Sequence, residues 1–537
     1  MAGADASEQV TTIGLDEVGV ERLQEPPLVG RRGYAGLVVF GILLCLLMGA
    51  LDNFVVLTAL KAILIDFNAP STGQTFIVSA YLITSTVAIP VFAKLSDLFD
   101  RKRVFISGLL IFIGGSILSG LSQNLNELIA FRAVQGFGSG DFFPVGLAIV
   151  AVIFPPETRA RVTGLLSGVF GIATVAGPFI GNFIVQTTTW RWVFYVNIPV
   201  GAVGLLILLL TLGPIRPEHR ARFDVVGAGL LAGWVATLMF PLVEVSQPGT
   251  GWSWSDPRLF ALLATAVVLA VAFVLWELRT PTPLVPLRLF RRRVIATCST
   301  GTFIVGLVIF PLATFLTLFI NYVTFGGVGD PSATVRDVLY ALVVPLVFGA
   351  ALGGVLLPRI TYRAATLLGL AIGGIGLFFL RGIGSSTPVW TFTAGVVPSG
   401  GIILPLIPLG FGVGITFPVF LLAVQNQVES AEVGAATGLV QFFQSLGGAL
   451  GLTLLSSYQE LRIQDLSPAL PSGGCPPNLP PSPACISYGE GVVAATTTAS
   501  QEVFTIMFVL LVLGLVAAVF ITGRLPRSSD PKSPTVL

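Results

Sequence analysis

Charged side chains within long apolar stretches are the residues of this sequence that offer the most chemistry. Asp52 lies within the apolar run 35–60, and Arg132 and Asp141 lie within the run 127–154. A charge at the centre of a bilayer costs roughly 2.5 to 3.5 kcal/mol on insertion scales, so each of these groups needs a partner or water. A carboxyl group in such surroundings binds or releases a proton as its neighbours change. These three residues are therefore candidates for proton coupling.

Asp52 and Arg132 are expected at similar depths in the membrane. Asp52 lies eight residues before the end of its run, and Arg132 lies five residues after the start of the other. At about 1.5 Å per residue, these positions are roughly 12 and 8 Å from the same boundary. The two side chains can therefore pair, and the pair either holds and releases a proton or only fixes the packing of the helices.

Asp141 follows Arg132 by nine residues, which is about half a turn out of phase on an ideal helix. It should therefore face away from Arg132. We expect Asp141 either to line the inner half of a central cavity or to contact the fifth apolar span.

Apolar runs dominate the chain: 54% of its residues are hydrophobic and only 10% are charged, with a mean hydropathy of +0.90. Soluble domains have roughly 25% charged residues. A helix of about 20 apolar residues crosses the hydrocarbon core of a bilayer. Fourteen runs of about that length lie at 35–60, 73–95, 104–123, 127–154, 163–185, 192–213, 224–245, 258–277, 295–320, 338–358, 364–384, 399–423, 435–457 and 503–523. The sequence therefore predicts an all-α membrane protein with fourteen transmembrane helices.

When the chain crosses the membrane at each of these spans in turn, most of the 29 Lys and Arg residues lie on the same side of the membrane as the N-terminus. Because cytoplasmic loops carry an excess of such residues, both termini are expected to be cytoplasmic, in a multi-pass protein of the plasma (cell inner) membrane. The net charge of +2 is dispersed among short loops. It favours contact with anionic membrane lipids and gives no reason to expect nucleic acid as a partner.

A ten-residue segment at 136–145 is repeated 274 positions later at 410–419, and seven of the ten positions are identical. Long parallel repeats in an apolar chain are typical of transporters with two lobes and a substrate site between them. The expected organisation is a cytoplasmic tail at 1–33, a six-helix lobe at 34–213, an inserted helix pair with flanking cytoplasmic loops at 214–294, a second six-helix lobe at 295–523 and a cytoplasmic tail at 524–537.

The segment 93–103 carries an acid, Asp97, followed by cations that include Arg101 and Lys102. It resembles the signature loop of the major facilitator superfamily. The resemblance implies that Asp97, Arg101 and Lys102 form a conformational latch at the cytoplasmic mouth, where a carboxylate accepts backbone N–H groups at a helix N-terminus.

Further motifs resemble those of the fourteen-helix drug/proton antiporter branch of that superfamily. They are Leu51-Asp52-Asn53 in the first span, Arg132-Ala133-Val134-Gln135-Gly136 in the fourth, a glycine motif with Gly168, Gly171, Gly177, Pro178 and Gly181 in the fifth, and the phrase 190–199 that follows. The glycine motif is expected to act as a packing hinge, because glycine permits close approach and bending of helices.

The resemblance implies the major facilitator fold, with two six-helix lobes plus an inserted helix pair. It also implies a proton-coupled secondary active exporter of hydrophobic small molecules that works by alternating access, as a monomer, with the proton gradient in place of any cofactor. An exporter of lipids or glycolipids is the alternative, and an uncoupled facilitator or uptake carrier is less favoured. The sequence contains no Gly-x4-Gly-Lys-Ser/Thr loop, which argues against an ATP-driven pump. Enzymatic activity is not expected.

Polar residues within the spans are candidates for the wall of a central cavity, although contact between helices is the alternative for any one of them. They are Gln74, Tyr81, Thr84, Gln135, Gln425, Gln441 and Gln444. The chain has 39 Phe and only 8 Tyr, which favours a hydrophobic substrate over a sugar.

The stretch 458–502 is rich in Pro and Gly, is expected to be an outer loop, and holds Cys475 and Cys485. Disulfides persist outside the cell, so these two closely spaced residues are candidates for one disulfide. A pair of free thiols is the alternative.

Overall fold

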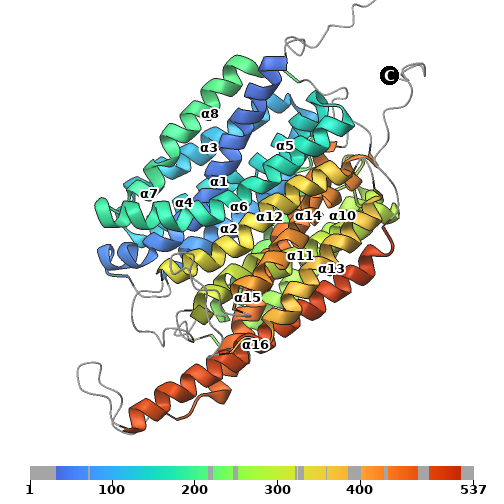
Figure 1. The fold of residues 1–537 in the computed structure, drawn as a ribbon. Coiled ribbons are helices and arrows are strands. Elements are labelled where there is room, and N and C mark those ends of the chain that lie inside the picture. The colour runs from blue at the N-terminus through green and yellow to red at the C-terminus, as the bar shows by residue number, and fades with distance from the viewer. Residues whose placement is uncertain are drawn as a thin grey trace, which may run out of the picture.

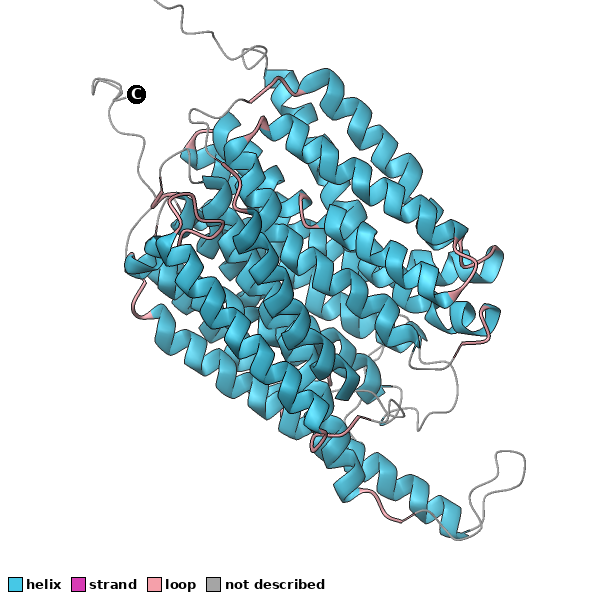
Figure 2. Cartoon of the chain, turned by 180° about the vertical axis from the view of Figure 1, so that it is seen from behind, coloured by secondary structure: helices cyan, strands magenta, loops and turns pink. Residues whose placement is uncertain are grey.

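The structure, a computed structural model, describes residues 32–521 with gaps at 70–72, 216–221, 246–251, 321–322, 324–331, 358–359, 385–400, 429–432 and 470–482. The described residues are almost entirely helical, and their helices lie side by side in one bundle (Figures 1 and 2). The predicted tails fall outside the described residues, apart from the first two residues of α1.

The first lobe comprises α1 (Arg32–Asp66), α2 (Gly73–Leu98), α3 (Arg101–Leu121), α4 (Leu125–Ser139), α5 (Phe142–Ile153), α6 (Pro156–Thr187), α7 (Trp192–Tyr195) and α8 (Asn197–Thr211). The inserted pair comprises α9 (Val225–Val245) and α10 (Pro257–Arg279), followed by the 3-10 helix η1 (Leu287–Arg291). The second lobe comprises α11 (Arg293–Phe319), α12 (Ser332–Leu356), α13 (Tyr362–Leu380), α14 (Ile403–Gln425), α15 (Val433–Leu466) and α16 (Pro483–Ala518).

Thirteen segments of the described chain are long and apolar enough to cross a membrane, one of them made of α4 and α5 together. The remaining predicted span, 163–185, lies within α6, a continuous helix of 32 residues. The protein is therefore an integral multi-pass membrane protein with the predicted all-α architecture.

The two lobes pack against each other mainly through two pairs of helices, with smaller contacts of α5 with α15 and of α6 with α14. α6 of the first lobe contacts α12, and α2 contacts α15. Of the inserted pair, α9 contacts both α2 and α15, whereas α10 packs mainly on α9. The inserted pair therefore covers the side of the molecule where α2 and α15 meet.

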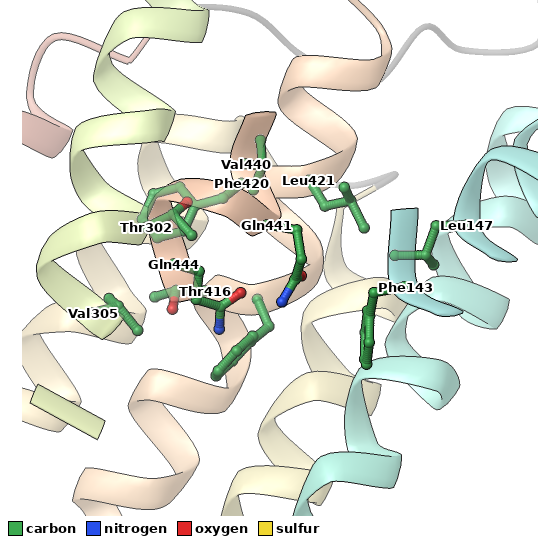
Figure 3. Close-up of a pocket in the computed structure, with 11 residues that line it drawn as sticks. Phe143, Leu147, Thr302, Val305, Thr416, Phe420, Leu421, Val440, Gln441 and Gln444 are labelled. Atoms are coloured by element: carbon green, nitrogen blue, oxygen red, sulfur yellow. The ribbon is translucent and has the colours of Figure 1, made fainter. Parts of the chain in front are cut away.

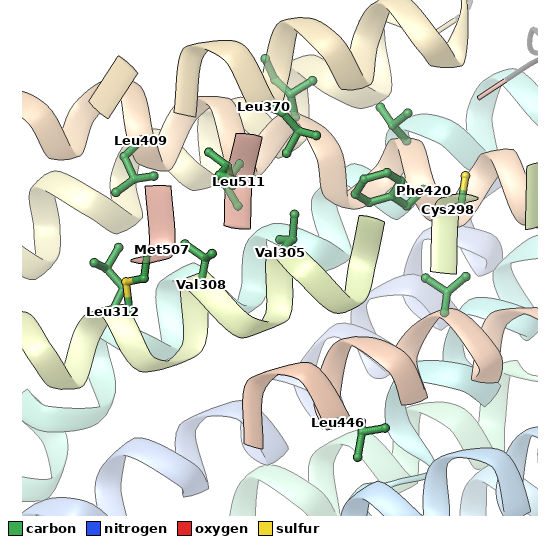
Figure 4. Packing of buried hydrophobic residues seen from close by; sticks show 14 of the residues in the cluster. Cys298, Val305, Val308, Leu312, Leu370, Leu409, Phe420, Leu446, Met507 and Leu511 are labelled. Carbon is green, nitrogen blue, oxygen red and sulfur yellow. The ribbon is translucent and has the colours of Figure 1, made fainter. Parts of the chain in front are cut away.

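Aliphatic and aromatic side chains fill the interior of each lobe. In the second lobe, Leu312 and Val308 of α11 pack with Met507 and Leu511 of α16 (Figure 4). All four side chains are almost completely buried. Such close packing leaves little empty space inside the lobe.

α15 and α16 are longer than the sequence predicted. With 34 and 36 residues, each is about 50 Å long at 1.5 Å per residue, whereas the hydrocarbon core is about 30 Å thick. Their connected ends extend beyond the rest of the bundle (Figure 1). The prediction of an irregular loop over 458–502 is therefore wrong for 458–466 and 483–502.

Polar contacts between these two helices explain their length. Glu502 of α16 accepts hydrogen bonds from the guanidinium of Arg462, at 2.8 and 2.9 Å, and from Tyr458 Oη, at 2.9 Å. Gln459 Nε2 donates to Ser500 Oγ at 3.0 Å. These contacts join the two helices through polar side chains, which a hydropathy pattern does not detect.

Cys485 lies in the first turn of α16 and is disulfide-bonded. Its predicted partner, Cys475, falls outside the described residues. Cys45 and Cys298 are free thiols and are buried.

Candidate functional site

An ion pair between Asp52 of α1 and Arg132 of α4 lies at the centre of the first lobe. Arg132 Nη1 is 2.5 Å from Asp52 Oδ2, and both side chains are almost fully buried. The other carboxylate oxygen, Oδ1, accepts hydrogen bonds from Gln135 Nε2 at 2.8 Å and from Asn197 Nδ2 at 2.9 Å. The pairing predicted from the depths of the two residues is therefore present.

Ser116 of α3 links the amides around Asp52. Its hydroxyl accepts hydrogen bonds from Gln135 Nε2 at 3.1 Å and Asn197 Nδ2 at 3.0 Å, and it donates to the carbonyl of Phe194 at 2.9 Å. We call Asp52, Arg132, Gln135, Asn197 and Ser116 the charge cluster. Asn197 and Ser116 were not predicted as site residues, although an asparagine at the start of an apolar span was an available signal.

The start of α4 and a glycine of α3 position the charge cluster. Asn124 caps α4 by accepting from the backbone amide of Glu127 at 2.9 Å, and the Glu127 carboxylate accepts in return from the backbone amide of Gln123 at 2.8 Å, one residue before the cap. Gly115 lies against the backbone of Gln135, where a Cβ atom would come within 2.6 Å of the Gln135 nitrogen. The absence of a side chain there lets α3 and α4 approach closely enough for their polar groups to meet.

Asp141 lies where the fourth span breaks between α4 and α5. It is fully buried, and neither carboxyl oxygen has a hydrogen-bond partner. The carboxyl packs against Gly108 of α3. Asp141 was expected at the cavity or against the fifth span; its neighbours Gly140 and Phe142 line the cavity, whereas Asp141 turns toward α3.

The second lobe places an apolar side chain in the corresponding position. Ile415, the counterpart of Asp141 in the repeated segment, packs against Gly369 of α13. Asp141 against Gly108 thus occupies a packing site that elsewhere holds an isoleucine. A carboxyl group without a partner in such a site is expected to be neutral, because an unpaired buried charge is strongly unfavourable.

Asp97, in the last turn of α2, joins the two lobes. Its carboxylate accepts hydrogen bonds from the amides of Gly434 at 3.0 Å and Ala435 at 2.7 Å, at the start of α15. Arg101 Nη2 is 3.3 Å from Asp97 Oδ1. The first amides of a helix have no partner within the helix and carry partial positive charge, so a carboxylate binds well there.

Lys102 was predicted to belong to the same latch, but its ammonium group lies elsewhere. It donates to the carbonyls of Leu209 at 2.9 Å and Leu212 at 2.5 Å, at the end of α8. Lys102 therefore caps a helix within the first lobe and does not take part in the contact between lobes.

A cavity of about 350 Å³ lies between the lobes. Residues of α1, α2, α4 and α5 form one wall, and residues of α11 and α15 form the other. Phe54, Phe143 and Phe310 contribute aromatic surface, and Tyr81 and Gln441, both predicted to line a cavity, contribute polar groups. This volume lies within the size range of pockets for drug-sized ligands.

A second, much smaller space of about 20 Å³ lies beside it (Figure 3). Gln441 and Gln444 of α15 line it together with Thr416 of α14 and Phe143 of α5. It is large enough to hold about one water molecule. Gln441 borders both spaces and so lies on the boundary between them.

Of the other predicted cavity residues whose side chains the structure describes, none lines the larger cavity. Gln135 belongs to the charge cluster, the Thr84 hydroxyl donates to the carbonyl of Ala80 at 2.8 Å, and Gln425 Nε2 donates to Thr437 Oγ1 at 2.9 Å. The side chain of Gln74 falls outside the described residues. Gln135 and Gln425 therefore take the alternative role of contact between helices, whereas the Thr84 hydroxyl bonds within its own helix.

The glycine motif of α6 faces two helices. Gly168 lies against Val347 of α12, and Gly177 and Gly181 lie against α1, around Phe54 and Val55. The surroundings of Gly171 and Pro178, also within α6, fall outside the described residues. α6 therefore packs closely against helices of both lobes, and the role of its glycines as a packing hinge stays a prediction.

Comparisons with known proteins agree with this architecture. Residues 42–452 match the Major Facilitator Superfamily. Similar proteins include the multidrug resistance protein 3 of Bacillus subtilis (strain 168), with 30% identity covering 79% of both chains. The tetracenomycin C resistance and export protein of Streptomyces glaucescens is 29% identical over 82% of this chain and 79% of its own.

Solved structures share the fold at low sequence identity. The proton:xylose symporter XylE superposes with a TM-score of 0.58 at 14% identity, covering 90% of this chain and 95% of its own. The human organic anion transporter MFSD10 gives a TM-score of 0.57 at 17% identity, covering 89% and 99%. With the family match extending over most of its length, the chain belongs to the major facilitator superfamily of membrane transporters.

Proposed function

We propose that this protein is a proton-coupled secondary active exporter of hydrophobic small molecules that works by alternating access. The observation that carries the proposal is the buried Asp52–Arg132 pair directly behind the wall of the cavity between the lobes. The names of the relatives, a multidrug resistance protein and an antibiotic export protein, support export as the direction of transport.

Asp52 is the proposed proton acceptor. Its carboxylate is held by Arg132, Gln135 and Asn197 in this conformation. Protonation would cancel the attraction to Arg132 and remove an acceptor from the two amides. The guanidinium would then lose its counter-charge and have to move, so the proton and the conformation are linked.

Tyr81 connects the charge cluster to the cavity. The Arg132 guanidinium carbon lies 4.2 Å from the centre of the Tyr81 ring, Tyr81 Oη donates to the carbonyl of Gly49 at 3.4 Å, and Tyr81 lines the cavity. Movement of Arg132 therefore shifts a cavity wall residue. Through this contact, protonation of Asp52 can change the shape of the proposed substrate site.

Asp141 is proposed as a second proton-carrying group. Because its carboxyl has no partner, it is neutral in this conformation, and it can release a proton only when its packing against Gly108 opens. The break between α4 and α5 beside the cavity is a site where such a rearrangement can occur. Asp52 and Asp141 would then carry protons in different environments.

The latch at Asp97 supports alternating access. In this structure the amides of α15 hold α2, which closes the contact between lobes at that end. Opening the cavity toward this end requires these hydrogen bonds to break. In the proposed mechanism, a state with these hydrogen bonds intact alternates with one in which they are broken.

Transport in proteoliposomes tests the proposal. Purified protein is reconstituted with a fluorescent hydrophobic compound, and a pH gradient is imposed across the membrane. The wild type should move the compound against its gradient, whereas Asp52→Asn, compared at equal amounts of folded protein, should abolish this movement. Asp66→Asn, which removes a partly exposed acid from the same helix, serves as the control. Undiminished gradient-driven transport by Asp52→Asn would reject the assignment, and downhill transport alone by the wild type would indicate a facilitator.

A further inference from the structure

The wall of the cavity carries no formal charge among the residues that the structure describes. Its polar lining groups are hydroxyls and amides, including Asn53, Thr86 and Thr314 in addition to Tyr81 and Gln441. All of these side chains can donate or accept hydrogen bonds, but none can neutralise an ion. The remaining lining residues are mainly aliphatic, aromatic or glycine.

The charges nearest to the cavity are hidden behind this wall. Asp52 precedes Asn53 on α1, but Asn53 lines the cavity whereas the Asp52 side chain turns into the first lobe and is almost fully buried. Both Asp52 oxygens are bound by groups of the charge cluster. The ring of Tyr81 contacts both Arg132 and the cavity, so it separates the ion pair from any bound molecule.

We infer that the cavity selects uncharged aromatic or aliphatic molecules that carry a hydrogen-bonding group, and discriminates against organic cations. A cation entering this cavity would lose water without gaining a counter-charge, which is unfavourable in an environment of low polarity. A neutral molecule loses less on dehydration and can bond to the amide of Gln441. The inference rests on the proposed function, in that the cavity is taken as the substrate site.

Equilibrium dialysis of purified protein with two related probes tests this inference. Triphenylphosphine oxide is neutral and carries a strong acceptor, and tetraphenylphosphonium is a cation of similar shape. The wild type should bind the oxide at least about tenfold more tightly than the phosphonium, because only the cation requires a counter-charge. Ala449→Trp, which fills the cavity, should abolish binding of the oxide and so separates binding in the cavity from uptake by detergent.

A carboxylate placed on the wall should reverse the preference. Gln441→Glu is nearly isosteric, and Ser445→Asp provides a second variant on the same helix. Each should increase phosphonium affinity by about tenfold or more, whereas Gln186→Glu, on the exposed end of α6, should change neither affinity. Equal or tighter binding of phosphonium by the wild type, or no binding of the oxide, would overturn the inference. Binding requires no pH gradient, so this result is independent of whether transport proves to be proton-coupled.

Discussion

Asp97 Oδ2 accepts a hydrogen bond of 2.7 Å from the backbone amide of Ala435, and this contact joins α2 of the first lobe to the first turn of α15 in the second. The two residues are 338 positions apart in the chain. A single carboxylate therefore holds the helices together at one end of the interface between lobes. Its loss should affect the balance between conformations more than the stability of either lobe.

Asp97→Ala should favour separation of α2 and α15 at this end. The backbone amides of Gly434 and Ala435 would lose their acceptor, and hydrogen bonds to charged groups are worth about 1.5 to 3 kcal/mol, enough to change a population about tenfold or more. Spin labels at the ends of α2 and α15 would report longer distances by double electron–electron resonance. Arg103→Gln, which alters an exposed cation nearby, should leave the distances unchanged. Identical distributions for wild type and Asp97→Ala would contradict the role of the latch.

Arg132→Met should lower the thermal stability of the purified protein substantially. Removing one partner of a buried ion pair typically costs about 3 to 5 kcal/mol, because the other charge is left unpaired. The double variant Asp52→Asn/Arg132→Met removes both charges and should recover much of this loss. Thermal unfolding in detergent measures both variants. A double variant no more stable than Arg132→Met would indicate that packing around the guanidinium, and not the charge on Asp52, dominates.

Asp141→Asn should reduce the number of protons exchanged per substrate without preventing transport. The amide has nearly the same size as the carboxyl, so the packing against Gly108 is preserved while the proton-carrying group is lost. The measurement is the pH gradient that just balances a known substrate gradient in proteoliposomes. An unchanged ratio would show that Asp141 is only a packing residue, and Asp66→Asn provides the matched control.

The Asp66 carboxylate should give a small, acid-sensitive contribution to stability at the end of α1. Hydrogen bonds from the Trp190 indole and from Arg191 lower the pKa of Asp66 below its ordinary value of 3.8. A lowered pKa means that the stabilisation is present at pH values above 3.8 and is lost as the pH falls through the lowered pKa. Because Asp66 is partly exposed, the loss should be under about 1 kcal/mol.

Tryptophan fluorescence during acid titration checks this prediction. Protonation of Asp66 weakens the acceptor of the Trp190 indole, so the wild type should show a transition that Asp66→Asn lacks. Superimposable titrations of the two proteins would show that the contact does not affect Trp190 in solution. Asp256→Asn, which removes another lowered-pKa carboxylate at the start of α10, serves as a control for general acid effects.

Local sequence patterns were sufficient for those features that depend on one segment at a time. The apolar runs determined where helices cross the membrane, because hydropathy and length alone decide whether a segment can enter lipid. The depths of Asp52 and Arg132 along their runs predicted their pairing. A charged side chain within the membrane needs an opposite charge or water at the same depth. The acid of the segment 93–103 likewise indicated a contact with a helix N-terminus.

The direction in which each side chain points from its helix could be determined only from the tertiary structure. Asp52 and Asn53 are neighbours in sequence, yet the packing of α1 turns one into the charge cluster and the other toward the cavity. In the same way, the approach of α3 brings Gly108 against Asp141, and Glu502 joins α16 to α15 across 40 positions. A sequence read locally specifies the depth of a residue in the membrane. Which face it presents and to which partner depends on the simultaneous packing of helices that are distant in the chain.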